Sequence, residues 1–351
     1  MKKNYLIAVA VAALMLASTV AQAADISFSG QFRPRFISDN DTNDDTSNAN
    51  VFDTRIRLNA KANVNANTSV FLQFQSVGNW GTDSAGFGTR VSQGGSGPAL
   101  QANDTLNDVG FHQATLTLKN FLGQAVDVKV GRQEVVLDGH RLFGHTGWTT
   151  GAETKDAIRL THAAGNHTLN YIYIEGRNQD GATNSNNGNE RQHVFHANTQ
   201  GVMGGNLSGY FVITNDDSEQ ITPVDKNDWY TVGARQKGKL GGLDYRVEYY
   251  HQFGDGAVPG HDQDWRAGYT NTLLDGADID RDAHMVGIRV GKTFSSLPWK
   301  PSITLWYDNL SGTDDPFADG GTDPGNYATW QGDGGTRGIG APEYATEAGE
   351  W

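Results

Sequence analysis

Apolar and polar residues alternate with a period of two along many stretches of this chain. In the clearest stretch, residues 51–64, Ile56 and Leu58 fall on one face, and Arg55 and Arg57 fall on the other. A period of two is that of a β-strand, and about ten residues let a tilted strand cross a bilayer. The pattern predicts about 13 strands. They cover residues 25–38, 51–64, 68–81, 109–120, 125–137, 154–164, 167–178, 190–201, 205–216, 228–238, 242–253, 282–294 and 301–311.

The connections between these strands alternate between short and long. Turns such as 65–67 and 165–166 are short, whereas polar loops such as 39–50, 82–108 and 138–153 are much longer. Short periplasmic turns and long extracellular loops are typical of outer-membrane barrels. We therefore predict an all-β fold, a transmembrane antiparallel up-and-down β-barrel of about 14–18 strands when closed. About 13 of these strands are visible in the sequence pattern. A secreted β-sandwich or β-helix is the alternative.

The N-terminus has the features of a secretory signal peptide. Two lysines precede a short apolar run, and Ala21-Gln22-Ala23 places small residues where a signal peptidase cleaves. The run is shorter than the roughly 20 apolar residues that a membrane-spanning helix needs. We expect residues 1–23 to be the signal peptide and residues 24–312 to form the barrel.

The C-terminal region, residues 313–351, is rich in Gly, Asp and Pro and does not alternate. An odd strand count conflicts with the even counts of bacterial single-chain barrels, and an open edge would expose unpaired backbone groups to lipid. We interpret this region as a loop, or as an incomplete C-terminal part that stops before the last strands. The alternative is one weak strand that the pattern does not reveal.

Composition and charge narrow the possible functions. The chain has no cysteine, which excludes disulfides, thiolate metal sites and C-x-x-C-H haem attachment. Its formal charge of -13 becomes about -15 without the two signal-peptide lysines, which disfavours nucleic acid as a partner. A mean hydropathy of -0.52 is compatible with a barrel, because every second strand residue is polar. We expect no cofactor.

Several short segments form a series that is shared with a known family. They are Phe52–Leu58, Gln73–Gln75, Gly131–Gln133, Arg141–Gly144 and Asp156–Leu160. In these residues the chain resembles the alginate export family of outer-membrane porins. The resemblance implies a monomeric barrel of about 18 strands, whose basic lumen passes an anionic polysaccharide.

Arginines are frequent on the polar faces of the predicted strands. A charge on the lipid face near the bilayer midplane costs about 2 to 4 kcal/mol, so these faces should point into the lumen. By parity the inward arginines are Arg33, Arg35, Arg55, Arg57, Arg235, Arg246 and Arg289. The inward placement of Arg132 and Arg159 follows from the resemblance. Guanidinium groups bind carboxylate and phosphate, which predicts anion binding in the lumen. Alternatively, these arginines pair with lumen carboxylates such as Asp53, Asp156 and Glu248 and stiffen the barrel.

Two loop clusters could carry other chemistry. Asp39, Asp41 and Asp45 have the alternate spacing of calcium ligands, but an acidic residue stands where an EF-hand needs glycine. We treat them as weak calcium candidates in a solvated loop. His140 and His145 have acids nearby, as a hydrolytic or metal cluster would require. Because no catalytic motif accompanies them, we expect no enzyme.

These observations together favour a porin of the bacterial outer membrane that lets anionic solutes diffuse, or that exports an anionic oligosaccharide or polysaccharide. The expected partners are outer-membrane lipid and lipopolysaccharide, small anionic solutes or anionic polysaccharide, and a periplasmic protein, but no nucleic acid. One alternative is a barrel that sheathes a multihaem cytochrome, and another is a receptor or adhesin that acts through its loops.

Overall fold

The computed structural model describes residues 25–39, 49–79, 109–145, 147, 151–175, 190–216, 227–256 and 279–311. The predicted signal peptide and the region 313–351 lie outside these residues, as do the calcium candidates Asp41 and Asp45. Asp39 is the last residue of the first strand. No helix in the described part of the chain is long and apolar enough to span a membrane.

The described residues form one sheet of 13 antiparallel strands that pair in chain order. The strands are β1 (Asp25–Asp39), β2 (Ala49–Asn65), β3 (Thr68–Asn79), β4 (Gly110–Leu118), β5 (Asp127–Gln133), β6 (Lys155–Ala164), β7 (His167–Glu175), β8 (Glu190–Val202), β9 (Gly205–Asp216), β10 (Asn227–Leu240), β11 (Leu243–Gly256), β12 (Ile279–Thr293) and β13 (Ser302–Leu310). A short 3-10 helix, η1 (Phe121–Gly123), lies between β4 and β5. Each strand coincides with a predicted one apart from a few residues at its ends, so the all-β up-and-down fold is confirmed.

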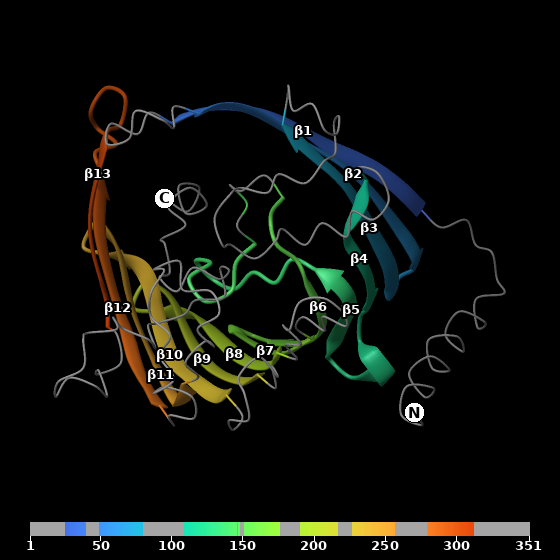
Figure 1. Cartoon of the computed structure of the whole chain (residues 1–351). Coiled ribbons are helices and arrows are strands. Elements are labelled where there is room, and N and C mark those ends of the chain that lie inside the picture. Colours follow the sequence, from blue (N-terminus) through green and yellow to red (C-terminus); the bar gives the residue numbers. More distant parts are fainter. Residues whose placement is uncertain are drawn as a thin grey trace, which may run out of the picture.

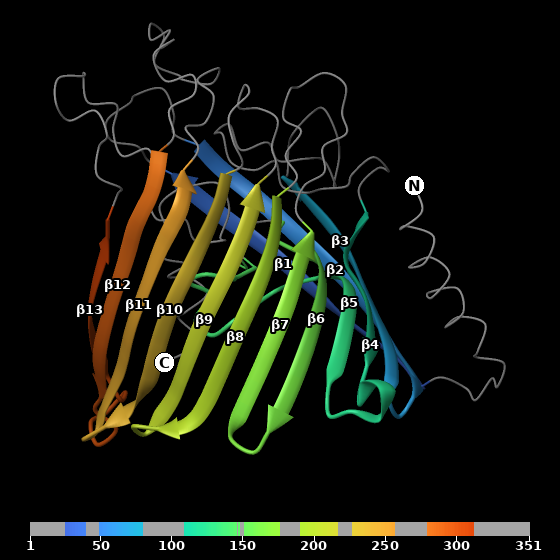
Figure 2. The same ribbon diagram turned by 90° about the horizontal axis from the view of Figure 1, so that it is seen from below.

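The sheet curves into an incomplete ring, seen along its axis in Figure 1 and from the side in Figure 2. Its two edges are β1 and β13, which do not pair with each other within the described residues. The strands are tilted, and the short turns lie together at one end of the sheet (Figure 2). This is the arrangement of a β-barrel wall that separates short turns from long loops.

The outer face of the sheet is apolar and exposed. On β1 the side chains of Phe28, Phe32 and Phe36 are 71%, 65% and 62% exposed, and Leu305 on β13 is 73% exposed. Large apolar side chains in such a row are stable when lipid, not water, surrounds them. The alternation predicted from the sequence therefore separates a lipid face from a lumen face.

Glycine permits the short turn between β8 and β9. Gly204, between β8 and β9, has a φ of 73°, and a Cβ at this position would lie 2.3 Å from the backbone oxygen of Lys239 on β10. A side chain would be strained by the positive φ and would also collide with the neighbouring strand. The turn therefore requires glycine in order to bring β8, β9 and β10 together.

The hydrophobic core lies inside the ring. Val135, Leu137, Leu142 and Phe143, which follow β5, are buried against inward side chains of the wall such as Ile172. The green trace of this segment runs through the interior of the ring in Figure 1. We predicted residues 138–153 as an extracellular loop, and that prediction is wrong. The burial of these apolar side chains stabilises the segment inside the barrel, because it removes them from water.

Candidate lumen constriction

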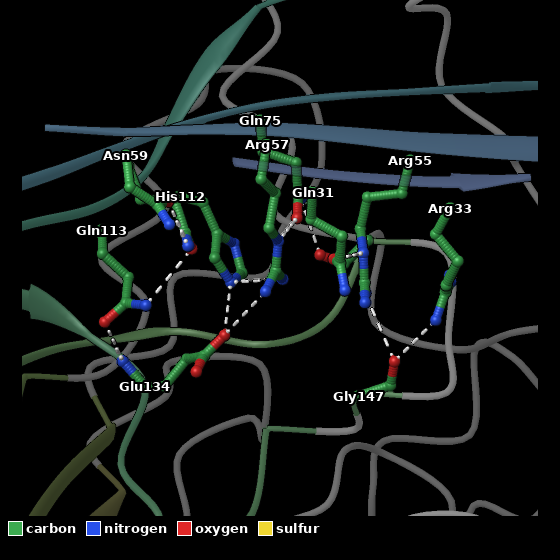
Figure 3. Close-up of polar contacts among 12 residues, drawn as sticks. Gln31, Arg33, Arg55, Arg57, Asn59, Gln75, His112, Gln113, Glu134 and Gly147 are labelled. Atoms are coloured by element: carbon green, nitrogen blue, oxygen red, sulfur yellow. Dashed lines mark hydrogen bonds and ion pairs between the residues drawn. The ribbon is translucent and has the colours of Figure 1, made fainter. Parts of the chain in front are cut away.

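Three arginines on β1 and β2 occupy adjacent positions on the inner face. Arg33 pairs directly with Arg55, and Arg57 pairs with Gln31 on β1 and with Gln75 on β3. Directly paired residues of antiparallel strands project from the same face of a sheet. Because the phenylalanines of β1 occupy the opposite face, these polar residues all point into the lumen, as Figure 3 shows.

The segment between β5 and β6 reaches across the lumen to these arginines. We call it the docked segment, and it comprises the described residues 134–145, 147 and 151–154. Arg33 Nη1 donates a hydrogen bond of 2.8 Å to the Gly147 carbonyl oxygen, and Arg55 Nη1 donates one of 3.3 Å to the same oxygen (Figure 3). Gln75 Nε2 donates one of 2.6 Å to the Gly151 carbonyl oxygen. The β1–β3 wall thus holds the segment through its backbone.

Glu134, the first residue of the docked segment, anchors its other end to Arg57. Arg57 Nη1 lies 3.3 Å from Glu134 Oε1, and His112 Nε2 lies 2.9 Å from the same oxygen (Figure 3). Burial raises the pKa of the Glu134 carboxyl, but the hydrogen bond from His112 and the positive charge of Arg57 outweigh burial and leave that pKa lowered. The carboxylate is therefore charged at neutral pH and binds the guanidinium of Arg57.

Arg33, Arg55 and Arg57 form one basic group of side chains. A second basic group lies on the opposite wall. Arg141 of the docked segment lies 3.3 Å from Glu248 on β11 and 3.2 Å from Asp308 on β13. Arg235 and Arg246 also approach Glu248, at 3.7 and 3.6 Å. Arg289 on β12 approaches Asp308 at 3.9 Å. Four guanidinium groups thus gather around two carboxylates among the described residues.

Asp138 fixes the docked segment to β8 and β9. His196 Nε2 lies 3.1 Å from Asp138 Oδ2, and the Tyr210 hydroxyl donates a hydrogen bond to the same oxygen. Burial raises the pKa of Asp138, but hydrogen bonds from His196, Tyr210 and Ser208 outweigh burial and lower that pKa from 3.8 to about 2. The three donors therefore favour the charged carboxylate, and their interaction with it stabilises docking.

The docked segment thus contacts both walls. Its apolar side chains pack against β7, β8, β9 and β12, and its backbone carbonyls face the arginines of β1 and β2. A segment bound in this way occupies part of the lumen, and guanidinium groups of both walls contact it or its partners. This is the geometry of a constriction in a barrel that conducts polar solutes.

The Alginate export family model matches residues 24–330. The chain belongs to the alginate export family. It is an outer-membrane porin or export channel of a Gram-negative bacterium. No curated protein sequence matches the chain.

Solved structures of outer-membrane porins are similar in fold. OccAB1 of Acinetobacter baumannii has 13% identity and a TM-score of 0.48, and the match covers 87% of this chain and 68% of that one. OccK9 (OpdG) of Pseudomonas aeruginosa has 14% identity and a TM-score of 0.48, with 83% and 69% covered. OccK2 (OpdF) of Pseudomonas aeruginosa, in complex with glucuronate, has 11% identity and a TM-score of 0.40, with 82% and 64% covered.

The structure places eight of the nine predicted arginines of this member of the alginate export family on the inner face. Besides the two basic groups, Arg35 lies 3.0 Å from Asp53, and Arg159 donates a hydrogen bond of 2.8 Å to Asn170. The eight residues are Arg33, Arg35, Arg55, Arg57, Arg159, Arg235, Arg246 and Arg289. Whether they bind anions stays a prediction.

Arg132 points outward, which corrects its predicted place in the lumen. It pairs with Asp156 on β6 and binds that carboxylate through two hydrogen bonds of 2.9 and 2.8 Å. The next outward residues, Val130 and Ile158, are 38% and 40% exposed, whereas Ala157, with the opposite parity, is buried in the core. Arg132 lies at the loop end of β5, away from the midplane, so an outward charge is less costly there.

The predicted carboxylate partners behave in two ways. Asp53 and Glu248 pair with inner arginines, as expected if lumen carboxylates pair with the arginines and stiffen the barrel. Asp156, in contrast, lies on the outer face.

Sequence reasoning missed Glu134 because we placed that residue in the predicted strand 125–137, whereas β5 ends at Gln133. It missed Arg141 because this residue lies in a segment, residues 138–153, that we took for a loop outside the barrel. The apolar residues of that segment were the available signal, because a solvated loop has no use for buried side chains.

The histidines of the docked segment lie close together. The rings of His140 and His145 are 5.1 Å apart. Burial lowers the pKa of His145, and the charges of Arg57 and Arg55 lower it further. No group of three or more potential ligands that could hold a metal ion occurs within the described ranges. The hydrolytic or metal cluster and the loop calcium site remain untested.

Proposed function

We propose that this outer-membrane channel passes anions, and that its cargo is a carboxylated sugar or an anionic polysaccharide. One observation carries the proposal. Guanidinium groups from both walls converge on the docked segment, which narrows the lumen between them. Inside a narrow passage of low dielectric, guanidinium groups attract anions and offer a bidentate fork that matches carboxylate geometry.

The balance of charge around the docked segment supports this selectivity. Within the described residues the two basic groups contain seven arginines and three carboxylates. The arginines are Arg33, Arg55, Arg57, Arg141, Arg235, Arg246 and Arg289, and the carboxylates are Glu134, Glu248 and Asp308. The net charge of -13 therefore does not oppose anion passage, since the charge near the constriction has the opposite sign.

The family supports the class of cargo, and the docked segment argues against one alternative. Alginate is an anionic polysaccharide, and the matched family is named for its export. A sheath for a multihaem cytochrome needs an open lumen. In this structure the docked segment fills part of the lumen, where its side chains Val135, Leu137 and Phe143 are buried. A diffusion or export channel with a constriction is the better match.

The test is the reversal potential of the purified protein in a planar bilayer under a KCl gradient. We expect a reversal potential on the chloride side for the native chain. The R55Q/R57Q variant, which removes two inner charges, should shift it toward zero or toward potassium. R132Q is the matched control, because it removes an ion-paired arginine from the outer face and should leave the reversal potential unchanged.

Two results would contradict the proposal. One is cation selectivity of the native chain, and the other is an equal shift in R132Q and R55Q/R57Q. Migration of the unheated protein on a denaturing gel, which differs between folded and unfolded barrels, would verify that each variant is folded.

A further inference from the structure

The outer face of the wall contains a hollow over β6–β9, the four strands that lie side by side in Figure 2. Its volume is about 510 Å³, and its lining is almost wholly apolar. Outward side chains such as Leu169, Phe195 and Phe211 surround it. The inward residue Tyr210 also lines it, as expected where the floor of the hollow is the backbone of the sheet. The hollow therefore opens toward the lipid around the barrel.

Small residues form the hollow beside a row of aromatic rings. Tyr171, Phe195 and Phe211 are direct cross-strand neighbours, and successive ring centroids are 5.1 and 6.2 Å apart. At the next outward pair toward the short turns, Ala197 lies opposite Gly209, where a Cβ would meet no atom within 4 Å. The φ of Gly209 is not positive, so the backbone does not require glycine at this position. The absent side chain leaves open space on the outer face.

The acyl chain of a membrane lipid fits this hollow better than water does. An apolar cavity holds no ordered water, because a water molecule needs polar partners. Ala197 and Gly209 lie near the middle of β8 and β9, at a depth where the outer face of a barrel contacts acyl chains. Acyl chains are as apolar as the lining, so close packing against the rings and the backbone, and not the hydrophobic effect, favours binding here.

His162 lines the hollow at its periplasmic end, close to the turn between β6 and β7. Its Nδ1 lies 2.6 Å from the carbonyl oxygen of Ala125. A carbonyl oxygen can only accept, so Nδ1 donates, and Nε2 of the neutral ring is then an acceptor. A lipid with its acyl chain in the hollow places its headgroup at this end. An ethanolamine headgroup offers ammonium N–H donors to Nε2, whereas the quaternary ammonium of choline has none.

We propose that this hollow binds a phospholipid with a primary-amine headgroup. One acyl chain packs against Phe195, Phe211 and Gly209, and the ammonium of the headgroup donates a hydrogen bond to Nε2 of His162. The site lies on the outer surface of the wall, so the inference does not depend on the cargo of the channel. It adds a lipid of defined headgroup to the general contact between barrel and bilayer.

The test measures which lipid collects beside the hollow. The chain has no cysteine, so L207C, on the outer face of β9 next to Gly209, gives a unique thiol for a bimane fluorophore. The full chain is reconstituted in phosphatidylcholine vesicles. Quenching by phosphatidylethanolamine with brominated acyl chains is compared with quenching by phosphatidylcholine with the same chains. We expect phosphatidylethanolamine to associate about fivefold more strongly, as one additional hydrogen bond predicts. L58C, on the outer face of β2, should show no preference.

A histidine variant tests the headgroup contact. H162F keeps a ring at this position and removes Nε2, so the preference for phosphatidylethanolamine at L207C should disappear. H284F is the matched control, because it makes the same replacement on the outer face of β12, away from the hollow. The preference should survive in H284F.

A second variant tests the hollow itself. G209L fills the open space without backbone strain and should lower quenching by both lipids to the level found at L58C. A60L, which adds the same side chain to the outer face of β2, should have no effect. If the migration of unheated G209L on a denaturing gel shows that it does not fold, A197L fills the same hollow.

Three results would overturn the lipid site. Equal association of the two lipids at L207C, or a preference that survives H162F, would exclude the headgroup contact. Unchanged quenching in G209L would exclude the hollow as the place where the acyl chain binds. Quenching by both lipids that is weaker at L207C than at L58C would show that protein, such as a second copy of the chain, covers the hollow instead of lipid.

Discussion

Asp138 makes docking of the segment sensitive to acid. The three hydrogen bonds to its carboxylate hold the pKa at about 2, below the ordinary 3.8. The docked form therefore binds fewer protons than the undocked form. Docking is fully stabilised by this carboxylate above about pH 4, and that stabilisation is lost as the pH falls through about 2. The difference between the two pKa values corresponds to about 2 kcal/mol of docking free energy.

Hydrogen exchange can measure this contribution. The amide of Leu137 donates a hydrogen bond to the Phe143 carbonyl and that of His140 to the Leu137 carbonyl, so both amides report on the docked turn. We expect their protection, corrected for the intrinsic pH dependence of exchange, to fall by about 30-fold from pH 5 to pH 2. In D138N, which keeps the size and loses the charge, protection should already be lower at pH 7.

The substitution also separates Asp138 from His145. The pKa of His145 is lowered by burial, so its protonation weakens docking as well, beginning near pH 6.5. D138N should abolish the step between pH 4 and pH 2 and keep any step at higher pH. The reasoning would be refuted by unchanged protection of Leu137 and His140 in D138N at pH 7, or by flat protection in the native chain down to pH 2.

Three further predictions concern packing, a buried ion pair and a turn. F143A removes a buried ring of the docked segment and should weaken docking by about 3–5 kcal/mol, seen as larger and noisier single-channel currents; unchanged currents would contradict the packing. E248Q leaves its arginine partners without their carboxylate and should lower barrel stability by about 3–5 kcal/mol in urea, whereas E175Q, at an exposed pair, should cost under about 1 kcal/mol. G204A should lower the urea midpoint more than G165A, because a Cβ at Gly204 meets a backbone oxygen and one at Gly165 meets nothing within 4 Å. Equal midpoints would refute the steric account.

The faces of the strands could be predicted because lipid and lumen impose opposite requirements on alternate residues. Phe32 and Phe36 on one face of β1 placed Arg33 and Arg35 on the other, and the structure agrees. The same rule does not determine which way the side chain of Arg132 points. That residue lies at the loop end of β5, where Gly131 has a φ of 117° and the guanidinium faces outward beside Asp156.

The sequence by itself determined the sheet, the approximate positions of its strands and the side on which most arginines lie. These features depend on near neighbours along the chain and on the contrast between lipid and water. The tertiary structure decided that the segment after β5 enters the lumen. Its contacts join residues far apart in the chain, such as Arg33 with Gly147 over 114 positions and Arg141 with Glu248 over 107. No local pattern encodes such pairs, because they exist only once the sheet has curved and brought both walls within reach of one segment.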